Sequence, residues 1–236
     1  MALFLVGTSG FSYRAWRGRF YPSRLKAAEM LHYYGERLDT VEINTTFYRN
    51  PTAETVTGWA EAVPTSFRFA MKAHRRVTHN RRMPNLEGAV AAMASVADGF
   101  GERLGPVLFQ FPPTAAYEEG RIERIAAAVP SHWRVAFQFR HRSWHIPAVA
   151  DRIETMGAAL CHGDGEGQPG PLGRGAFIYL RLRRTSYSPQ RLSVWERRIR
   201  NYLVEGRDVY VYFKHEDLAP TYAERTRARL QTSARI

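Results

Sequence analysis

Short apolar segments of this sequence end in polar or charged residues, and those ends could carry chemistry. Glu42 and Asn44 close the segment Thr40–Asn44, and Lys72 closes the segment Phe67–Lys72. A carboxylate can act as a general acid or base, while cations hold an anion and stabilise charge that develops during reaction. We therefore take Glu42 and Lys72 as candidate catalytic residues. Asp164, which follows another such segment, is the candidate partner of Glu42.

Other residues near these segment ends could bind a substrate. Amide side chains can orient it, cations can hold an anionic group, and aromatic rings can stack on a sugar or a base. The alternative for each ring is that it only packs its own loop onto the fold. The candidate substrate-binding residues are Asn44, Gln110, Gln138, Arg140, His141, Arg181, Lys214, Tyr13, Trp16, Tyr48 and Trp144.

These candidate residues do not balance in charge. Side chains alternate along an extended segment, and this alternation points five cations to the face that Glu42 and Asp164 share. An unpaired buried charge is costly, so the imbalance predicts an anionic ligand or an open, wet cleft. Ion pairs that merely fill the interior are the alternative. The five cations are Lys72, Arg140, Arg181, Arg183 and Lys214.

Arginine supplies nearly all of the positive charge of this chain. The net charge is +12, and of 34 basic residues only Lys26, Lys72 and Lys214 are lysines. Two of these three lysines stand at expected strand ends, where a compact ammonium can titrate and a guanidinium cannot. The basic balance favours a small anionic or phosphorylated ligand or nucleic acid as partner, and a solvated surface without a specific partner is the alternative.

The elements that must position these residues alternate along the chain. Apolar segments of strand composition are followed by segments of helix length, which implies a parallel sheet with right-handed crossovers. Eight such units predict a single (β/α)8 TIM-type barrel over residues 1–236, with the functional groups at the C-terminal ends of its strands. The expected strands are Leu3–Gly7, Thr40–Asn44, Phe67–Lys72, Val107–Phe111, Val135–Arg140, Ala158–His162, Phe177–Leu182 and Val209–Lys214, and the expected helices are 23–37, 52–63, 85–103, 118–129, 146–156, 189–204 and 219–233.

One unit departs from this alternation. Residues 163–175 contain six glycines and two prolines, a composition that no helix tolerates. The sixth connection is therefore expected to be a bare loop, or the barrel to be irregular at that side. A doubly wound open sheet is the structural alternative.

No cofactor motif is found. The turn 7–10 is neither a P-loop nor a dinucleotide fingerprint, so no nucleotide cofactor follows and the cofactor stays unknown. A metal site on the barrel loops is conceivable, but no fixed ligand spacing supports it. Its candidate ligands would be Glu42, His79, His162, Asp164 and His215.

The chain has a single cysteine, Cys161, so it cannot form an intrachain disulfide. Cys161 precedes His162, but neighbouring strand residues face opposite sides, so we expect Cys161 to be a small core residue and not a nucleophile. One cysteine fits a reducing compartment, and no stretch approaches about 18 apolar residues. The sequence therefore predicts a cytoplasmic protein without a membrane partner and leaves the oligomeric state open.

Six longer motifs run along almost the whole chain: Gly7–Tyr13 with Trp16, Thr40–Arg49, Phe69–Lys72, Leu104–Pro113, Phe139–Trp144 and Val209–Lys214. They resemble the YecE-like family, known as domain of unknown function 72. The resemblance implies a barrel fold and leaves the reaction unassigned. It also implies a glutamate at the position of Gln138, so that a member lacking this acid could be altered or inactive.

Three functions are open at this point. The first is an enzyme, hydrolase-like or isomerase-like, that acts on a phosphorylated or other anionic substrate. The second is a nucleic-acid-binding protein or nuclease that uses a basic rim around the barrel mouth. The third is a non-catalytic ligand-binding barrel. Steep salt dependence of binding would distinguish the second from the others.

Overall fold

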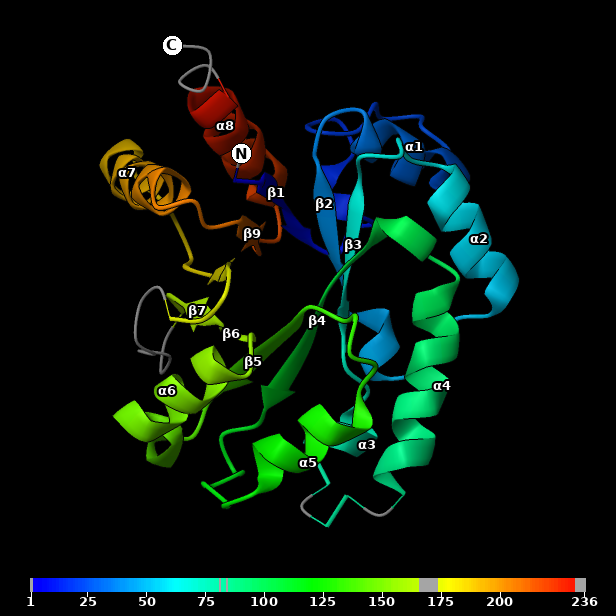
Figure 1. The fold of residues 1–236 in the computed structure, drawn as a ribbon. Helices are drawn as coiled ribbons and strands as arrows, with labels where there is room; N and C mark the ends of the chain where they lie inside the picture. The colour runs from blue at the N-terminus through cyan, green and yellow to red at the C-terminus, as the bar shows by residue number, and fades with distance from the viewer. Residues whose placement is uncertain (1, 81, 84, 166–173, 232–236) are drawn as a thin grey trace.

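The computed structural model describes residues 2–80, 82–83, 85–165 and 174–231 and shows parallel strands surrounded by helices (Figure 1). Over these residues the strands form one sheet of nine, in which every pair of neighbours is parallel. The expected TIM-type barrel is confirmed. The strands are β1 (Phe4–Ser9), β2 (Thr40–Ile43), β3 (Arg68–Lys72), β4 (Leu104–Phe111), β5 (Val135–Phe139), β6 (Ala159–Leu160), β7 (His162–Gly163), β8 (Ile178–Leu182) and β9 (Val209–Phe213).

Helices connect the strands and cover the outside of the sheet (Figure 1). The α-helices are α1 (Met30–Gly35), α2 (Ala53–Glu61), α3 (Arg75–Thr78), α4 (Leu86–Asp98), α5 (Arg121–Ala128), α6 (Pro147–Thr155), α7 (Pro189–Val204) and α8 (Ala219–Gln231). Short 3-10 turns lie at Arg14–Trp16, Ala27–Glu29, Thr45–Phe47, Gly101–Arg103 and Arg142–Trp144.

The strand order explains both the barrel and its irregular side. The order β6-β5-β4-β3-β2-β1-β9-β8-β7 is sequential around the sheet, unlike the reversing order of a doubly wound fold. Its two edges, β6 and β7, are halves of the expected sixth strand, separated by Cys161. One half pairs with β5 and the other with β8. The irregularity expected at the sixth unit is therefore a broken strand.

The chain also covers the edge that this break leaves. The Leu160 amide donates to the Arg174 carbonyl, the Ala176 amide donates to the Ala158 carbonyl, and Ala159 bridges to Gly175. These bonds satisfy backbone groups that would otherwise be buried without partners. The expected loop 163–175 falls mostly on residues 166–173, which lie outside the described residues.

Two helix expectations were too long. The first expected helix, 23–37, resolves into the turn Ala27–Glu29 and the short helix α1. The third, 85–103, ends as α4 at Asp98, and the turn Gly101–Arg103 follows. Gly99 and Gly101 interrupt that helix because glycine disfavours a helix interior and Gly101 adopts φ +53°.

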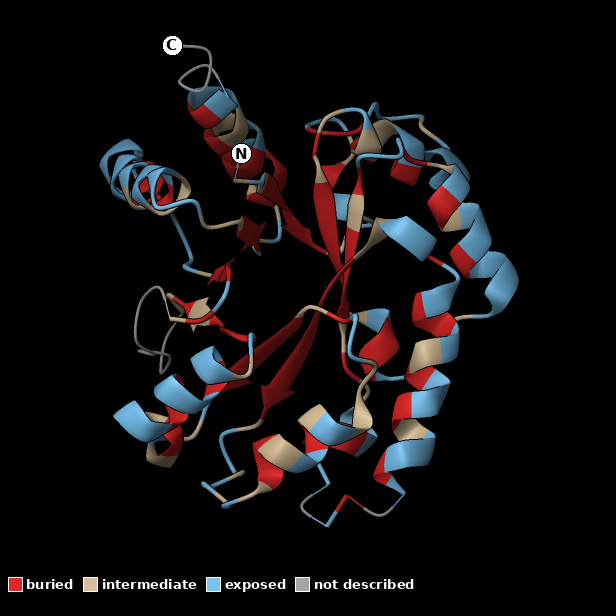
Figure 2. Cartoon of the chain, viewed as in Figure 1, coloured by how far each residue is buried: buried red, intermediate tan, exposed pale blue. Residues whose placement is uncertain are grey.

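Two apolar layers lie on opposite faces of the strands, which are almost entirely buried (Figure 2). Val41 and Ile43 belong to the large cluster between sheet and helices, so the intervening Glu42 faces the barrel interior as alternation predicts. A Cβ on Gly7 would lie 1.7 Å from the Thr40 carbonyl oxygen, which explains glycine at this close approach of β1 and β2. The inner cluster consists of Leu5, Ala70, Leu108, Ala136, Ala159, Cys161, Phe177, Tyr179, Tyr210 and Tyr212.

Candidate active site at the barrel mouth

Glu42, at the C-terminal end of β2, is fully buried and surrounded by donors. Its Oε1 accepts hydrogen bonds from the Ser9 hydroxyl at 2.8 Å and the Arg181 guanidinium at 2.7 Å, and its Oε2 accepts from the Tyr179 hydroxyl at 2.8 Å. The Asn44 amide donates to Oε1 at 3.2 Å. Burial raises the pKa of Glu42, but Arg181, Arg183 and these hydrogen bonds outweigh it and lower the pKa to about 2. Glu42 is therefore a carboxylate at neutral pH, which disfavours a role as general acid.

Arg181, in β8, links Glu42 to a pair of amides. Its guanidinium is 1% exposed and donates to the Oε1 of Gln138 at 2.6 Å as well as to Glu42. The Gln110 amide donates to the same Gln138 oxygen at 2.7 Å. Neighbouring strands thus place Gln110 and Gln138 beside Arg181, in the register Gln110 opposite Gln138. The neutral amide of Gln138 accepts from Arg181 without neutralising its charge.

Asp164 and Glu42 do not form the expected pair. The Asp164 carboxylate accepts from the Arg183 backbone amide at 2.7 Å and from the Tyr187 hydroxyl at 2.8 and 2.7 Å. It therefore fixes the turn that follows β8, because both donors belong to that turn. The Arg183 guanidinium lies 3.5 Å from Glu42, so Asp164 acts on the site by placing Arg183.

Two lysines share this end of the barrel with the arginines. Lys72 ends β3, and its Nζ lies 3.9 Å from the centroid of the Phe47 ring. Burial together with Arg181, Arg183 and Lys214 lowers the pKa of Lys72 to about 8, although Glu42 acts in the opposite direction. Burial and the two arginines also lower the pKa of Lys214, which follows β9. These mutual effects show that the cations lie within electrostatic range of one another.

The charges of this cluster do not cancel. Four cations (Lys72, Arg181, Arg183 and Lys214) face Glu42, and Asp164 is already bound to the turn after β8. Burial and Arg181 lower the pKa of Arg183 to about 10. Among the described residues, the buried Nε atoms of Arg181 and Arg183 have no hydrogen-bond acceptor. The cluster therefore has unbalanced positive charge and unused hydrogen-bond donors, which are the properties that an anion with acceptor oxygens would match.

Arg140 and His141 occupy the rim. Arg140 follows β5, is exposed and contributes to the field at His79, where burial, Lys72, Arg75 and Arg140 lower the pKa of the imidazole to about 4. His141 Nδ1 lies 2.7 Å from the Ser143 hydroxyl and accepts from the Ser143 amide. His141 therefore caps the turn Arg142–Trp144, and the structure gives it a positioning role beside the mouth.

Two of the four candidate rings are core residues. Trp16 is 1% exposed and donates to the Glu216 carbonyl, while Trp144 is 2% exposed, stacks on Phe139 and donates to the Ala115 carbonyl. Both join loops to the barrel and offer no free face for stacking on a ligand. Tyr48 is 69% exposed on the rim, and Tyr13 lies near Glu42 and Arg183, which both affect its pKa.

The residues weighed for metal or nucleophilic chemistry do not converge. His162 contacts the Trp195 ring on the helix side of the strand, and the His215 ring accepts from the Asp217 amide. Among the described residues there is no group of three or more His, Cys, Asp and Glu side chains that could hold a metal ion. Cys161 is a buried residue of the inner cluster, and burial raises the pKa of its thiol to about 12. Its expected role as a core residue agrees with this environment.

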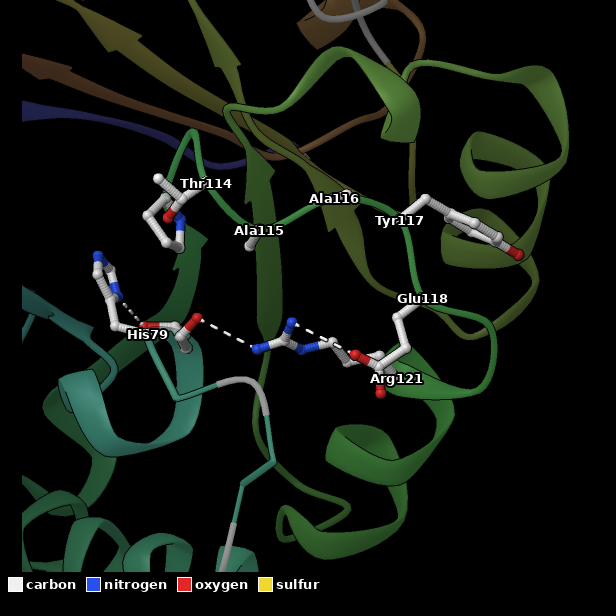
Figure 3. A pocket seen from close by; sticks show the side chains of 9 residues that line it. His79, Thr114, Ala115, Ala116, Tyr117, Glu118 and Arg121 are labelled. Atoms are coloured by element: carbon white, nitrogen blue, oxygen red, sulfur yellow. Dashed lines mark hydrogen bonds and ion pairs between the residues drawn. The ribbon is translucent and has the colours of Figure 1, made fainter.

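A cavity of about 160 Å³ lies beside the end of β4, away from the Glu42 cluster (Figure 3). The guanidinium of Arg121 is 2% exposed and donates to the carbonyls of Thr78 and Asn80, and Thr78 hydrogen-bonds to His79. Glu118 lies opposite Arg121 at 3.8 Å. Arg121 thus ties the segment after β3 to α5 and holds His79 at the rim. No local sequence pattern predicts this contact, because Arg121 is 43 residues from Thr78 and 41 residues from Asn80 in the chain.

Sequence reasoning missed three residues of the mouth. Ser9 and Tyr179 are direct hydrogen-bond partners of Glu42, and Arg183 was noted as a cation without being assigned to ligand binding. Alternation along the seventh expected strand, Phe177–Leu182, already places Tyr179 on the inner face, so the signal for this residue was present. Ser9 lies beyond the first expected strand, Leu3–Gly7, in the segment expected to be a turn.

The fold and this cluster together define a parallel α/β barrel protein with a cationic site at the C-terminal ends of its strands, the usual location of function in such barrels. The chain belongs to the family described as protein of unknown function DUF72, which matches residues 5–236. No helix within the described part of the chain is long and apolar enough to cross a bilayer.

Solved and curated relatives agree with this family. A DUF72 family protein from Thermotoga maritima superposes with a TM-score of 0.82 at 22% identity over 99% of this chain and 100% of that chain. One from Enterococcus faecalis gives 0.75 at 18% identity, over 100% and 99%. The UPF0759 protein YecE of Escherichia coli is 25% identical over 131 residues, 55% of this chain. That match spans about half the length of the curated relative (47%).

Proposed function

We propose that the protein is an enzyme that binds a small phosphorylated or otherwise anionic substrate at the barrel mouth. One observation carries this proposal: among the described residues, four cations, Lys72, Arg181, Arg183 and Lys214, gather around the carboxylate of Glu42, and Glu216 adds a second carboxylate only near Lys214. Burial and, after it, repulsion among these cations lower the pKa of Lys72 and Lys214, and a bound anion would relieve the repulsion. We also propose a cytoplasmic location, on the strength of the single buried cysteine.

The contacts support a distinct role for each group. Glu42 holds Arg181 in place, because it is itself fixed by Ser9 and Tyr179. Arg183 and Lys214, like Lys72, are not fully buried, and they can contact the anion directly. Gln110 and Asn44 orient the substrate. Lys72, with a pKa of about 8, is the group that can exchange a proton near neutral pH.

Thermal unfolding in the presence of phosphate or sulfate tests the anion site. A ligand that binds only the folded state raises the melting temperature by mass action. Arg183→Met should reduce this rise. Gln138→Glu should weaken binding roughly tenfold, the effect of about 1.4 kcal/mol of added repulsion. Arg191→Met, on the exposed face of α7, is the matched control for losing one positive charge.

The same measurement separates the remaining functions. If Arg183→Met and Arg191→Met reduced the rise in melting temperature equally, the anions would be acting on the overall surface charge. That result would contradict the proposed anion site. Oligonucleotide binding that is far tighter than phosphate binding and falls steeply with salt would favour a nucleic-acid partner. Anion binding without turnover of phosphorylated sugars or nucleotides would favour a non-catalytic barrel. Turnover that Gln138→Glu raises would indicate that the acid at this position had been lost.

A further inference from the structure

Lys72 differs from Arg181 and Arg183 of the barrel mouth in having no ion pair with Glu42. Among the described residues, the ion pairs of Glu42 go to Arg181 and Arg183, and no ion pair or hydrogen bond engages the Lys72 ammonium. Its Nζ instead lies against the face of the Phe47 ring, at 3.9 Å from the ring centroid. A ring stabilises the ammonium only modestly and provides no acceptor for its protons. Deprotonation of the Lys72 amine therefore gives up only the modest stabilisation by the ring and no ion pair with any described residue.

The surroundings of Lys72 also favour the neutral amine. The side chain is partly buried, and Arg181, Arg183 and Lys214 oppose its positive charge more strongly than Glu42 supports it. The His79 ring also packs against the Phe47 ring, at 4.8 Å between ring centroids, and its imidazole is uncharged at neutral pH. A desolvated lysine next to other cations is the arrangement that activates an amine as a nucleophile.

We propose that Lys72 is the nucleophile of this site and forms an imine with the carbonyl carbon of an anionic aldehyde or ketone. This inference rests on the proposed function, because Arg183 and Lys214 must hold the anionic group while Lys72 attacks. The neutral amine adds to the carbonyl carbon, forming a C–N bond and a carbinolamine. Loss of the carbonyl oxygen as water then gives the imine, so the step needs no oxidant or reductant.

Competing nucleophiles are few in this chain. The Cys161 thiol is buried inside the barrel, and its pKa is raised to about 12. Guanidinium groups stay protonated and do not form imines under these conditions. The remaining side-chain amines are Lys214 and the exposed Lys26. A chain with three lysines thus allows each amine to be followed separately.

Reductive trapping on the full-length protein tests the proposal. Pyridoxal 5′-phosphate serves as an anionic aldehyde probe, borohydride reduces any imine to a stable amine, and peptide mass spectrometry assigns the modified lysine. We expect the adduct on Lys72 to exceed that on Lys26 by at least about tenfold at neutral pH, because more of its amine is unprotonated. Inorganic phosphate should suppress it, and pyridoxal without the phosphate should give much less.

Two variants separate this proposal from the anion site itself. Lys72→Arg should lose the adduct while phosphate still raises the melting temperature, because the charge is kept. Lys26→Arg, at an exposed lysine outside the barrel mouth, should keep the adduct on Lys72. A main adduct on Lys214 or Lys26, or one on Lys72 that phosphate does not suppress, would overturn the nucleophile. If phosphate fails to stabilise the unmodified protein at all, the proposed function itself is wrong.

Discussion

At the scale of single residues, the site depends on one carboxylate that several donors hold in an ionised state. Glu42 is buried with Arg181, and the two groups compensate for each other's desolvation. At Lys72, burial and then repulsion by neighbouring cations lower the pKa to about 8, so the neutral amine becomes accessible. Glu42 and Lys72 lie at the same end of the barrel but differ in their chemistry, because among the described residues Glu42 has an ion pair and Lys72 has none.

Replacing Glu42 by glutamine should destabilise the protein strongly. The substitution leaves Arg181 buried without its counter-ion, which typically costs about 3–5 kcal/mol. Urea denaturation measures this change. Glu123→Gln is the control, because its partner Arg152 is half exposed and such a pair contributes about 0–1 kcal/mol. A similar cost for the two variants would contradict the central role of the Glu42–Arg181 pair.

Because of Glu42, we expect the stability of the protein to depend on pH in the acid range. The pKa of Glu42 is about 2 in the folded protein and 4.5 as its ordinary value. The unfolded chain therefore binds the proton first, and this part of the stability is present above about pH 4.5 and is lost as pH falls towards 2. Denaturation midpoints across this window should fall less in Glu42→Gln than in the parent. Parallel curves would show that other carboxylates cause the loss.

Because of Lys72, we expect anion binding to weaken as the pH rises into the alkaline range. A bound anion stabilises the protonated ammonium, so by linkage the protonated protein binds the anion more tightly. Stabilisation by sulfate, which does not titrate here, should therefore shrink as pH rises through about 8. Lys72→Arg should show a much flatter profile, since arginine stays charged. The same slope in both proteins would assign the effect to Lys214, whose pKa is also lowered.

At the scale of elements, the turn after β8 determines where Arg183 lies. Asp164 follows β7 and accepts from the Arg183 amide and the Tyr187 hydroxyl, so it joins two consecutive strands at the barrel mouth. The broken sixth strand makes this possible, because β7 pairs with β8 independently of β6. Asp164, which the sequence suggested as a catalytic residue, is thus better explained as a residue that positions Arg183.

Asp164→Ala should therefore weaken both stability and anion binding. Two buried donors lose their acceptor, which costs about 1–3 kcal/mol. Sulfate stabilisation should fall as well, since Arg183 is no longer fixed. Asp208→Ala is the matched control, because Asp208 binds Arg134 at 2.7 Å at the N-terminal ends of the strands. That variant should lose stability and keep its response to sulfate. An unchanged sulfate response in Asp164→Ala would refute the supporting role.

At the scale of the whole molecule, the barrel is closed by pairing everywhere except at the break in its sixth strand. β1 pairs with both β2 and β9, so the first strand of the chain lies next to the last one. The break falls at Cys161, whose side chain lies in the inner cluster. This cysteine is therefore a reporter of whether the barrel opens locally at the break or only unfolds as a whole.

We expect Cys161 to react with thiol reagents only through global unfolding. Cys161 is 4% exposed, and burial raises the pKa of its thiol to about 12. Labelling rates at increasing urea should give the same denaturant dependence as the equilibrium unfolding transition followed by circular dichroism. Labelling that is fast in native buffer, or independent of urea, would reveal local opening between β6 and β7.

The sequence by itself determined the barrel and the inward position of Glu42, Lys72 and Arg181, because strand alternation and the repeated strand–helix pattern are local properties. The sequence also located the irregular sixth unit, since glycine and proline disfavour a helix at their own positions. Only the tertiary structure decided which groups pair. Asp164 binds Tyr187 and Arg183 instead of Glu42, and Trp16 and Trp144 are core residues instead of ligand platforms. Such pairing depends on distances between residues far apart in the chain, which no local pattern encodes.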